Sequence, residues 1–236
     1  MTRLGLPRVH HRVLDSTNER AKELARAGAP HGTVVTADEQ TTGRGRQGRA
    51  WFAPPGAALL MSVVVRGLEG RHALLPLTAA VAVCEAAEQN AEVQCAIKWP
   101  NDVWVKRRKL AGILIEARHH EGVAVIGVGL NVATRSGDFP DELRDLATSL
   151  AIESPDGVHP RDGVLAALID ALEAQLAHPP ERILEQWGQR DALRGSRVAW
   201  AGGEGIAAGV DASGALRVET TGGLISLDAG EVHLQR

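Results

Sequence analysis

Residues 40–51 of this chain read QTTGRGRQGRAW, a run rich in glycine and arginine. Within it, residues 43–48 satisfy the G-x-G-x-x-G pattern of dinucleotide-binding domains. In those domains the glycines open a helix whose N-terminus holds a pyrophosphate, whereas here residues 51–56 read WFAPPG, which does not form a first helical turn. The sequence also has no G-x-x-x-x-G-K-[ST] pattern. We therefore expect neither a dinucleotide-binding loop nor a P-loop of the usual kind.

Three arginines stand in this loop: Arg44, Arg46 and Arg49. The glycines between them let the backbone fold closely around a ligand. Two cations about 6 Å apart repel each other by roughly 1 kcal/mol in water, and more strongly at a protein surface. We expect the loop to bind an anion and to be loose until that anion arrives. A solvated basic surface loop is the alternative that these residues alone leave open.

The segments before the loop carry clear secondary-structure signals. The β-branched run at residues 33–37 predicts a strand that leads into the loop, and the alternation at residues 8–14 predicts an earlier strand. Between these strands, Ser16 is followed three positions later by Glu19, which is the pattern of a capping box. The sequence thus predicts a helix that begins after Ser16, is capped by both side chains and ends near Ala27.

The middle of the chain is predicted to be mainly sheet. Apolar and β-branched runs predict strands at residues 57–65, 93–98, 103–105, 110–116 and 123–132. The spacing of apolar residues predicts helices at residues 73–88, 160–176 and 180–190. Beyond these, short alternating strands separated by glycine-containing turns are typical of a small β-barrel-like module. We predict two domains, residues 1–191 and residues 192–236.

Composition limits the kinds of function that fit this chain. Its 236 residues, 44% of them hydrophobic, suffice for one sizeable domain and a small one. Lys and Arg number 26 against 29 Asp and Glu, so no overall field favours nucleic acid or anionic lipid as a partner. Cys84 and Cys95 are too few for a disulfide framework, which suits a reducing cytosol. With no signal-peptide pattern and no apolar run long enough to span a bilayer, we expect a cytoplasmic protein that does not associate with membranes.

Five segments, in this order and at this spacing, resemble the biotin-protein ligase family: Ser16-Thr17-Asn18, residues 40–51, residues 98–102 (KWPND), residues 109–114 (KLAGIL) and residues 127–131 (GVGLN). The C-terminal β module is similar to the small SH3-like domain of the family. The resemblance implies an α+β fold, in which a mixed β-sheet is backed by helices as in class II aminoacyl-tRNA synthetases and biotin ligases. A small C-terminal SH3-like β-barrel would follow this catalytic domain.

Two features bear on the type of ligase. The strand pattern begins by Val9, which leaves no room for the N-terminal DNA-binding domain of the bifunctional members, so we expect a monofunctional ligase without a nucleic-acid partner. Gln47 stands where many relatives carry another basic residue. Two alternatives stay open: a lipoate-protein ligase of the same fold, and a biotin-dependent DNA-binding regulator.

The resemblance also implies an activity. Biotin and ATP would form biotinyl-5'-AMP with Mg²⁺ as cofactor, and the biotin would then pass to a lysine of a biotin carboxyl carrier protein or domain of a carboxylase. The first step brings a carboxylate against a polyanion, so cations are needed to neutralise both partners. The oligomeric state consistent with this activity is a monomer or a homodimer.

Site residues follow by similarity. Lys109, Arg46 and Arg44 are the expected catalytic residues, with Lys109 reaching the carboxylate and the α-phosphate. Biotin binding is assigned to Ser16, Thr17, Asn18, Gln40, Gly43, Arg44, Gly45, Arg46, Lys109 and Gly112. ATP binding is assigned to Arg46, Arg49, Trp51, Asn101, Lys109 and Asn131, and magnesium contact to Asp102. Each has a structural alternative: helix capping for Ser16, packing for Trp51 and turn closure for Asn131.

Overall fold

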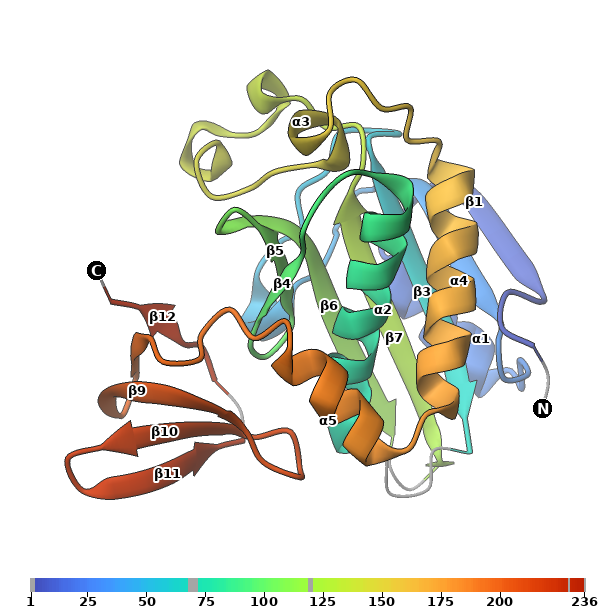
Figure 1. The fold of residues 1–236 in the computed structure, drawn as a ribbon. Coiled ribbons are helices and arrows are strands. Elements are labelled where there is room, and N and C mark those ends of the chain that lie inside the picture. Colours follow the sequence, from blue (N-terminus) through green and yellow to red (C-terminus); the bar gives the residue numbers. More distant parts are fainter. Residues whose placement is uncertain (1–2, 68–71, 119–120, 229, 236) are drawn as a thin grey trace.

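The computed structural model describes residues 3–67, 72–118, 121–228 and 230–235, and these form two sheets of different size (Figure 1). The larger sheet belongs to the N-terminal part of the chain and has helices packed on it, whereas the smaller one is built by the C-terminal residues. Over the ranges just given, no helix is both long and apolar enough to cross a membrane.

Seven strands form the larger sheet in the order β1-β2-β3-β7-β6-β5-β4. β1 and β2 run parallel, and the other neighbouring pairs are antiparallel. The sheet is therefore mixed, which confirms the predicted α+β class. The strand bounds are β1 (Arg8–Leu14), β2 (Val34–Gln40), β3 (Ala58–Arg66), β4 (Ala96–Lys98), β5 (Asp102–Val105), β6 (Arg108–Arg118) and β7 (Val123–Asn131).

Helices cover both faces of this sheet. On β3, Val63 belongs to the core that contains α2 (Leu75–Asn90) and α4 (Arg161–Ala177), which lie side by side in Figure 1. The next residue, Val64, packs instead with Ala21 of α1 (Thr17–Arg26). Successive side chains of a strand point to opposite faces, so α1 lies on the face opposite to α2 and α4.

The smaller sheet is antiparallel throughout, in the order β11-β10-β9-β8-β12. Its strands are β8 (Arg197–Trp200), β9 (Gly203–Val210), β10 (Leu216–Thr220), β11 (Gly223–Leu227) and β12 (His233–Leu234). Two more helices precede it, α3 (Leu150–Glu153) and α5 (Pro180–Gly188). The small C-terminal β module is thereby confirmed, while the boundary at residue 191 stays a prediction that falls between α5 and β8.

Contacts tie the smaller sheet to the end of β4. The backbone N–H of Ile97 donates to Arg190, and that of Ala192 donates back to Ile97. The indole N–H of the buried Trp99 donates to the carbonyl of Gly214 at 3.0 Å. The module therefore lies next to residues 98–102, which come directly after β4.

Two local predictions are wrong. β4 begins at Ala96 and not at residue 93, because residues 91–95 carry turn and irregular backbone. The capping box is also absent: Ser16 is the extended residue before α1, but within the described chain its side chain caps no amide of that helix. Glu19 turns away from the helix start and binds Lys22 and Arg44 instead.

Candidate active site

Alternating glycines on β7 hollow out one face of the larger sheet. Ile126, Val128 and Leu130 are buried in the core beneath α2, while Gly127 and Gly129 between them point to the face of α1. Their neighbour across the strands is a third glycine, Gly112 of β6, which pairs with Gly129. At these glycines the face of α1 is therefore bare backbone, whereas the opposite face of β7 carries bulky side chains.

Side chains from elsewhere in the chain lie on this bare backbone. A Cβ atom at Gly127 would be 2.0 Å from Oδ1 of Asn18, and one at Gly129 would be 2.5 Å from the Trp51 ring. At Gly112 a Cβ atom would be 2.9 Å from the same ring. Glycine is therefore required at all three positions for Asn18 and Trp51 to lie where they do.

An open cavity of about 930 Å³, its mouth included, lies above the glycines. It brings together the N-terminus of α1, the glycine-arginine loop, the β5–β6 hairpin and residues 230–232 of the C-terminal part. The expected site residues that line it are Ser16, Thr17, Asn18, Gln40, Arg44, Gly45, Arg46, Arg49, Trp51, Asn101, Asp102, Lys109 and Gly112. Residues far apart in sequence thus meet in one hollow.

Two expected site residues are not among the described residues that line the cavity. Gly43 lies behind its wall, where its carbonyl accepts the backbone N–H of Trp51 at 2.9 Å. Asn131 is buried, and its amide donates to the carbonyl of Thr148 at 2.9 Å. Asn131 therefore holds the segment around Thr148, and its assignment to ATP stays a prediction.

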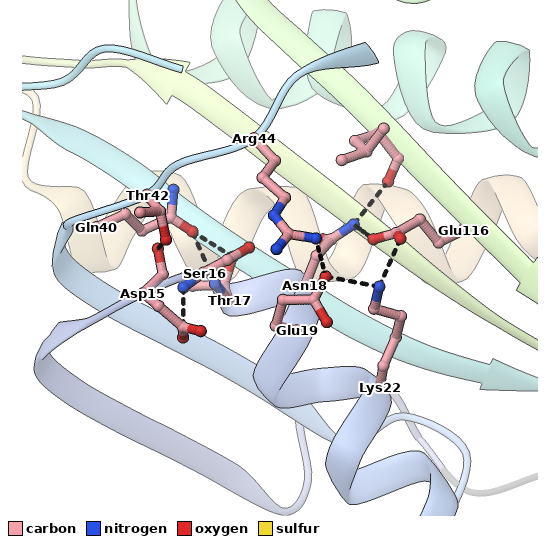
Figure 2. Close-up of polar contacts among 11 residues, drawn as sticks. Asp15, Ser16, Thr17, Asn18, Glu19, Lys22, Gln40, Thr42, Arg44 and Glu116 are labelled. Carbon is pink, nitrogen blue, oxygen red and sulfur yellow. Dashed lines mark hydrogen bonds and ion pairs between the residues drawn. The ribbon is translucent and has the colours of Figure 1, made fainter. Parts of the chain in front are cut away.

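A polar network fixes one end of the cavity at the start of α1 (Figure 2). Thr17 donates to Oε1 of Gln40 from both its backbone N–H, at 2.7 Å, and its hydroxyl, at 3.0 Å. The hydroxyl of Ser62 lies 2.6 Å from Oδ1 of Asn18, and Nδ2 of Asn18 donates to Glu116 at 2.8 Å. Because the amides of Gln40 and Asn18 are each held in one orientation, this end can recognise a rigid polar group.

The glycine-arginine loop closes on itself through its backbone. Gly45 donates to the carbonyl of Arg49 at 2.7 Å, and a short 3-10 turn spans Arg46–Gly48. Gln47, within that turn, has a left-handed φ of 56°. No α-helix follows the loop in the described residues up to Arg66, where β3 ends, so the expectation that this is not a dinucleotide-binding helix start is confirmed.

Two loop arginines pair with carboxylates from distant parts of the chain. Arg44 binds Glu19 of α1, and Arg49 binds Glu231, which precedes β12. The hydrogen bond from Arg49 is the main cause that lowers the pKa of Glu231. These two carboxylates offset the self-repulsion among the arginines, and the expected ordering of the loop by an anion stays a prediction.

The deeper cations lie around the β5–β6 hairpin. Nζ of Lys109 is 2.7 Å from Oδ1 of Asp102 and 5.7 Å from the centroid of the Trp51 ring, a distance at which a cation–π attraction operates. Arg46 is half-buried and lies 3.4 Å from Oδ1 of Asn101. Burial lowers the pKa of Arg46, and the negative charge of Asp102 opposes that shift. The guanidinium remains charged, because its ordinary pKa is far above neutral.

The acidic residues do not form a metal cage. Among the described residues, no group of three or more His, Cys, Asp or Glu side chains is placed to hold a metal ion. Asp102, the expected magnesium contact, here binds Lys109. A lone carboxylate suits a magnesium ion that arrives with the phosphates of a nucleotide, since this ion keeps several water and phosphate ligands.

Sequence reasoning missed several residues of the cavity. Lys98 lines it, and burial lowers the pKa of this lysine. Lys98 stands inside a segment that carried the family resemblance, so a signal for it existed. Glu231 lines the cavity as well, but it is far from the loop in sequence and belongs to no pattern.

The pocket has a glycine floor, a polar end and converging cations, and family models give the class of protein that carries it. The model described as the biotin/lipoate A/B protein ligase family matches residues 10–132, and the biotin protein ligase C terminal domain matches residues 197–234. The chain therefore belongs to the biotin protein ligase family and is a ligase.

Individual relatives extend this result to nearly the whole chain. The sequence is 36% identical over 245 residues to the bifunctional ligase/repressor BirA of Bacillus subtilis, covering 98% of this chain and 75% of that protein. It is 35% identical over 241 residues to the biotin-[acetyl-CoA-carboxylase] ligase of Mycobacterium tuberculosis, covering 93% and 86%. The fold matches the biotin protein ligase of Aquifex aeolicus in complex with biotin and ATP, with a TM-score of 0.84, 29% identity and coverage of 97% and 98%.

Proposed function

We propose that this ligase forms biotinyl-5'-AMP from biotin and ATP and then transfers the biotin to a lysine of a biotin carboxyl carrier domain. The observation that carries this proposal is the meeting of the polar end, the glycine floor and the cations in one cavity. A flat floor and fixed amides suit the rigid ureido head of biotin, and the cations suit a carboxylate next to phosphates. The solved relative with biotin and ATP bound supports the same substrates.

In the first half-reaction an oxygen of the biotin carboxylate attacks the α-phosphorus, and pyrophosphate leaves. Negative charge grows at the phosphoryl oxygens, so the cations must already be in place when it does. Lys109, which lies beside Asp102 and the Trp51 ring, reaches the carboxylate and the α-phosphate, and Arg44 and Arg46 cover the reacting ends. No covalent bond to the enzyme forms, because both reacting groups belong to the substrates.

Ser16, Thr17, Asn18 and Gln40 hold the ureido head. Gly45 and Gly112 line the same cavity, and Gly43 contributes from the loop backbone, where its carbonyl holds Trp51. ATP lies toward Arg49, Asn101 and Trp51, whose ring offers a stacking face. Because Arg49 already binds Glu231, nucleotide binding exchanges a carboxylate for a phosphate on this arginine. Asp102 would hold the Mg²⁺ that accompanies the nucleotide, and the ion would supply neutralisation of phosphate charge.

In the second half-reaction the lysine amine of the carrier domain attacks the carbonyl of biotinyl-AMP, and AMP leaves with the electron pair of the broken C–O bond. The acceptor must approach through the open mouth of the cavity, past the glycine-arginine loop. We place this reaction in the cytoplasm, because Cys84 and Cys95 are both buried and free, as suits a reducing compartment.

The test is an assay of the purified protein with radiolabelled biotin or lipoate, ATP, Mg²⁺ and a carrier domain. We expect biotinyl-AMP without the carrier and labelled carrier when it is present. Omission of ATP and a carrier that lacks its acceptor lysine are the controls. Formation of lipoyl-AMP without biotinyl-AMP would assign the protein to the lipoate branch of the family instead.

A further inference from the structure

A chain of alternating charges joins the glycine-arginine loop to the polar end of the cavity. It runs from Arg44 through Glu19, Lys22 and Glu116 to Asn18 (Figure 2). Lys22 donates to Glu19 at 2.8 Å and to Glu116 at 2.6 Å, and Glu116 accepts from Asn18 at 2.8 Å. Each of the inner three groups therefore touches two partners. Glu19 and Lys22 each have an opposite charge on both sides, whereas Glu116 has Lys22 on one side and the neutral amide of Asn18 on the other.

The middle of this charge chain is well sheltered. The side chains of Glu19 and Lys22 are only 22% and 18% exposed, and they lie one turn apart on α1. A hydrogen bond from Lys22 lowers the pKa of Glu19. Burial alone would lower the pKa of Lys22, but its hydrogen bonds to Glu116 and Glu19 raise it. Both groups are therefore charged at neutral pH, and Glu19 and Arg44 form an ion pair between two full charges.

The place of Glu19 relative to the cavity decides what the Arg44 pair can do. Arg44 and Asn18 line the cavity, whereas Glu19 is not among the described residues that do. A ligand can thus fill the cavity while the pair stays closed, because Glu19 takes none of its space. Glu231 differs in this respect, since it lines the cavity and must give way to phosphates.

We propose that Glu19 is a positioning residue that fastens the glycine-arginine loop to α1 through Arg44 and so retains the adenylate in the cavity. The proposal rests on the proposed function for its ligand, biotinyl-AMP. Without the carboxylate of Glu19, Arg44 would lose this ion-pair partner and would be repelled by Lys22, which would keep Glu116 as its own partner. The loop would then be held less firmly over the end where Asn18 binds the ligand.

The variant Glu19→Gln keeps the size of the side chain and removes its charge. Glu23→Gln is the matched control, because Glu23 lies on the same helix, is 57% exposed and pairs with Arg20. We expect preformed biotinyl-AMP to leave Glu19→Gln about two- to fivefold faster than it leaves the wild type, which is the range for a partly exposed ion pair. The rate of adenylate synthesis at saturating substrates should change less than this release rate, and Glu23→Gln should behave as the wild type.

A double-mutant cycle with Arg44→Gln shows whether Glu19 acts through Arg44. If it does, Glu19→Gln adds little to the release rate once Arg44 is gone. A purely structural role in α1 would instead give the same added effect in both backgrounds, and this result would overturn the proposal. Slower release from Glu19→Gln would also overturn it, because Glu19 would then be holding Arg44 away from the ligand.

A second measurement needs no ligand. Trypsin cleaves after arginine, so the rate at which it cuts the loop at Arg44, Arg46 and Arg49 reports how firmly the loop is held. We expect faster cleavage of Glu19→Gln than of Glu23→Gln, and equal rates would contradict the fastening role. A wild-type protein that neither forms nor binds biotinyl-AMP would overturn the proposed function, whereas equal behaviour of the two variants in an active enzyme would overturn this inference alone.

Discussion

Lys109 and Asp102 form an ion pair across the β5–β6 hairpin, with 2.7 Å between Nζ and Oδ1. The pair holds the flexible lysine stem in one direction before any substrate is present. When a nucleotide binds, the ammonium group of Lys109 can exchange the carboxylate of Asp102 for a phosphoryl oxygen, so that it always has an anionic partner. Once Lys109 has moved to phosphate, the carboxylate of Asp102 would be the group available to hold a magnesium ion, which would neutralise phosphate charge.

Lys109→Ala should therefore impair chemistry far more than binding. Its main partner in the reaction is the charge that grows at phosphorus, so we expect adenylate synthesis to fall by about 10²–10³-fold while the affinity for biotin changes by less than about fivefold. Single-turnover kinetics and calorimetry measure the two quantities. Lys106→Ala is the control on the same hairpin, since Lys106 binds Glu153 and does not line the cavity. Equal losses of rate and affinity would show that Lys109 serves binding only.

Arg46→Gly should let the adenylate escape. Arg46 is half-buried, and its guanidinium lies beside Asn101, another residue that lines the cavity. Loss of charge-assisted hydrogen bonds of this kind weakens binding by roughly ten- to a hundredfold. Dissociation of preformed biotinyl-AMP, followed by rapid filtration, gives the rate. An unchanged rate would mean that Arg46 does not hold this intermediate.

Gly127→Ala should block the polar end of the cavity. The new methyl group would be 2.0 Å from Oδ1 of Asn18, so Asn18 must move and lose its fixed orientation. We expect biotin affinity to fall about tenfold or more, since overpacking of this kind typically costs about 1–3 kcal/mol. Gly137→Ala is the control, because nothing lies within 4 Å of a Cβ atom at that position. Calorimetry with biotin compares the two, and equal affinities would contradict the role of the glycine floor.

Glu153 gives the protein a pH-dependent stability. Its side chain is 1% exposed and accepts from Arg108 and Thr148, both at 2.6 Å. Burial alone would raise the pKa of Glu153, but hydrogen bonds from Thr148 and Lys106 and the charge of Arg108 hold the pKa below the ordinary 4.5. The stabilisation is thus complete above pH 4.5 and is lost as the pH falls through the folded-state pKa.

The variant Glu153→Gln isolates this contribution. We expect its free energy of unfolding to be lower than that of the wild type at neutral pH, by about 1–3 kcal/mol, because a charged acceptor of buried hydrogen bonds is replaced by a neutral one. The difference should shrink as the pH falls below 4.5, where the wild-type carboxyl takes up a proton. Urea unfolding at several pH values measures it, and a difference that does not depend on pH would rule out the ionised carboxylate as its source.

Much of the fold could be predicted, because the patterns that indicate most strands and helices each lie within one short segment of the sequence. The alternation on β1, the β-branched and apolar runs of β2 and β3 and the apolar spacing of α2 and α4 each lie within one segment, and the sequence places them within a few residues. Most residues of the candidate site could be predicted from the resemblance to the biotin-protein ligase family, whose motifs extend from α1 to β7. The chemistry of the arginines and Lys109 then follows from their charge.

What could not be predicted depends on distant partners. Glu19 has the local pattern of a capping residue, yet its carboxylate binds Lys22 and Arg44 and not the backbone N–H at the helix start. A hydrogen bond between two charged groups is stronger than one to a neutral backbone amide. Nothing near Arg49 points to Glu231, since only the fold brings the C-terminal residues to the loop. The motif at residues 127–131 assigns Asn131 to ATP binding. Its hydrogen bond to Thr148 depends on where residues 132–148 run in the fold, which no local pattern predicts.

The alternation of glycine with Val and Leu along β7 places two demands on a single strand. A β-branched residue at 127 or 129 would be the natural way to strengthen a strand in the middle of a sheet. The same change would fill the hollow in which Asn18 and Trp51 lie. A substitution that raises thermal stability at either position must therefore lower the catalytic rate. Stabilising substitutions for this enzyme have to be sought on the opposite face of the sheet or outside the sheet.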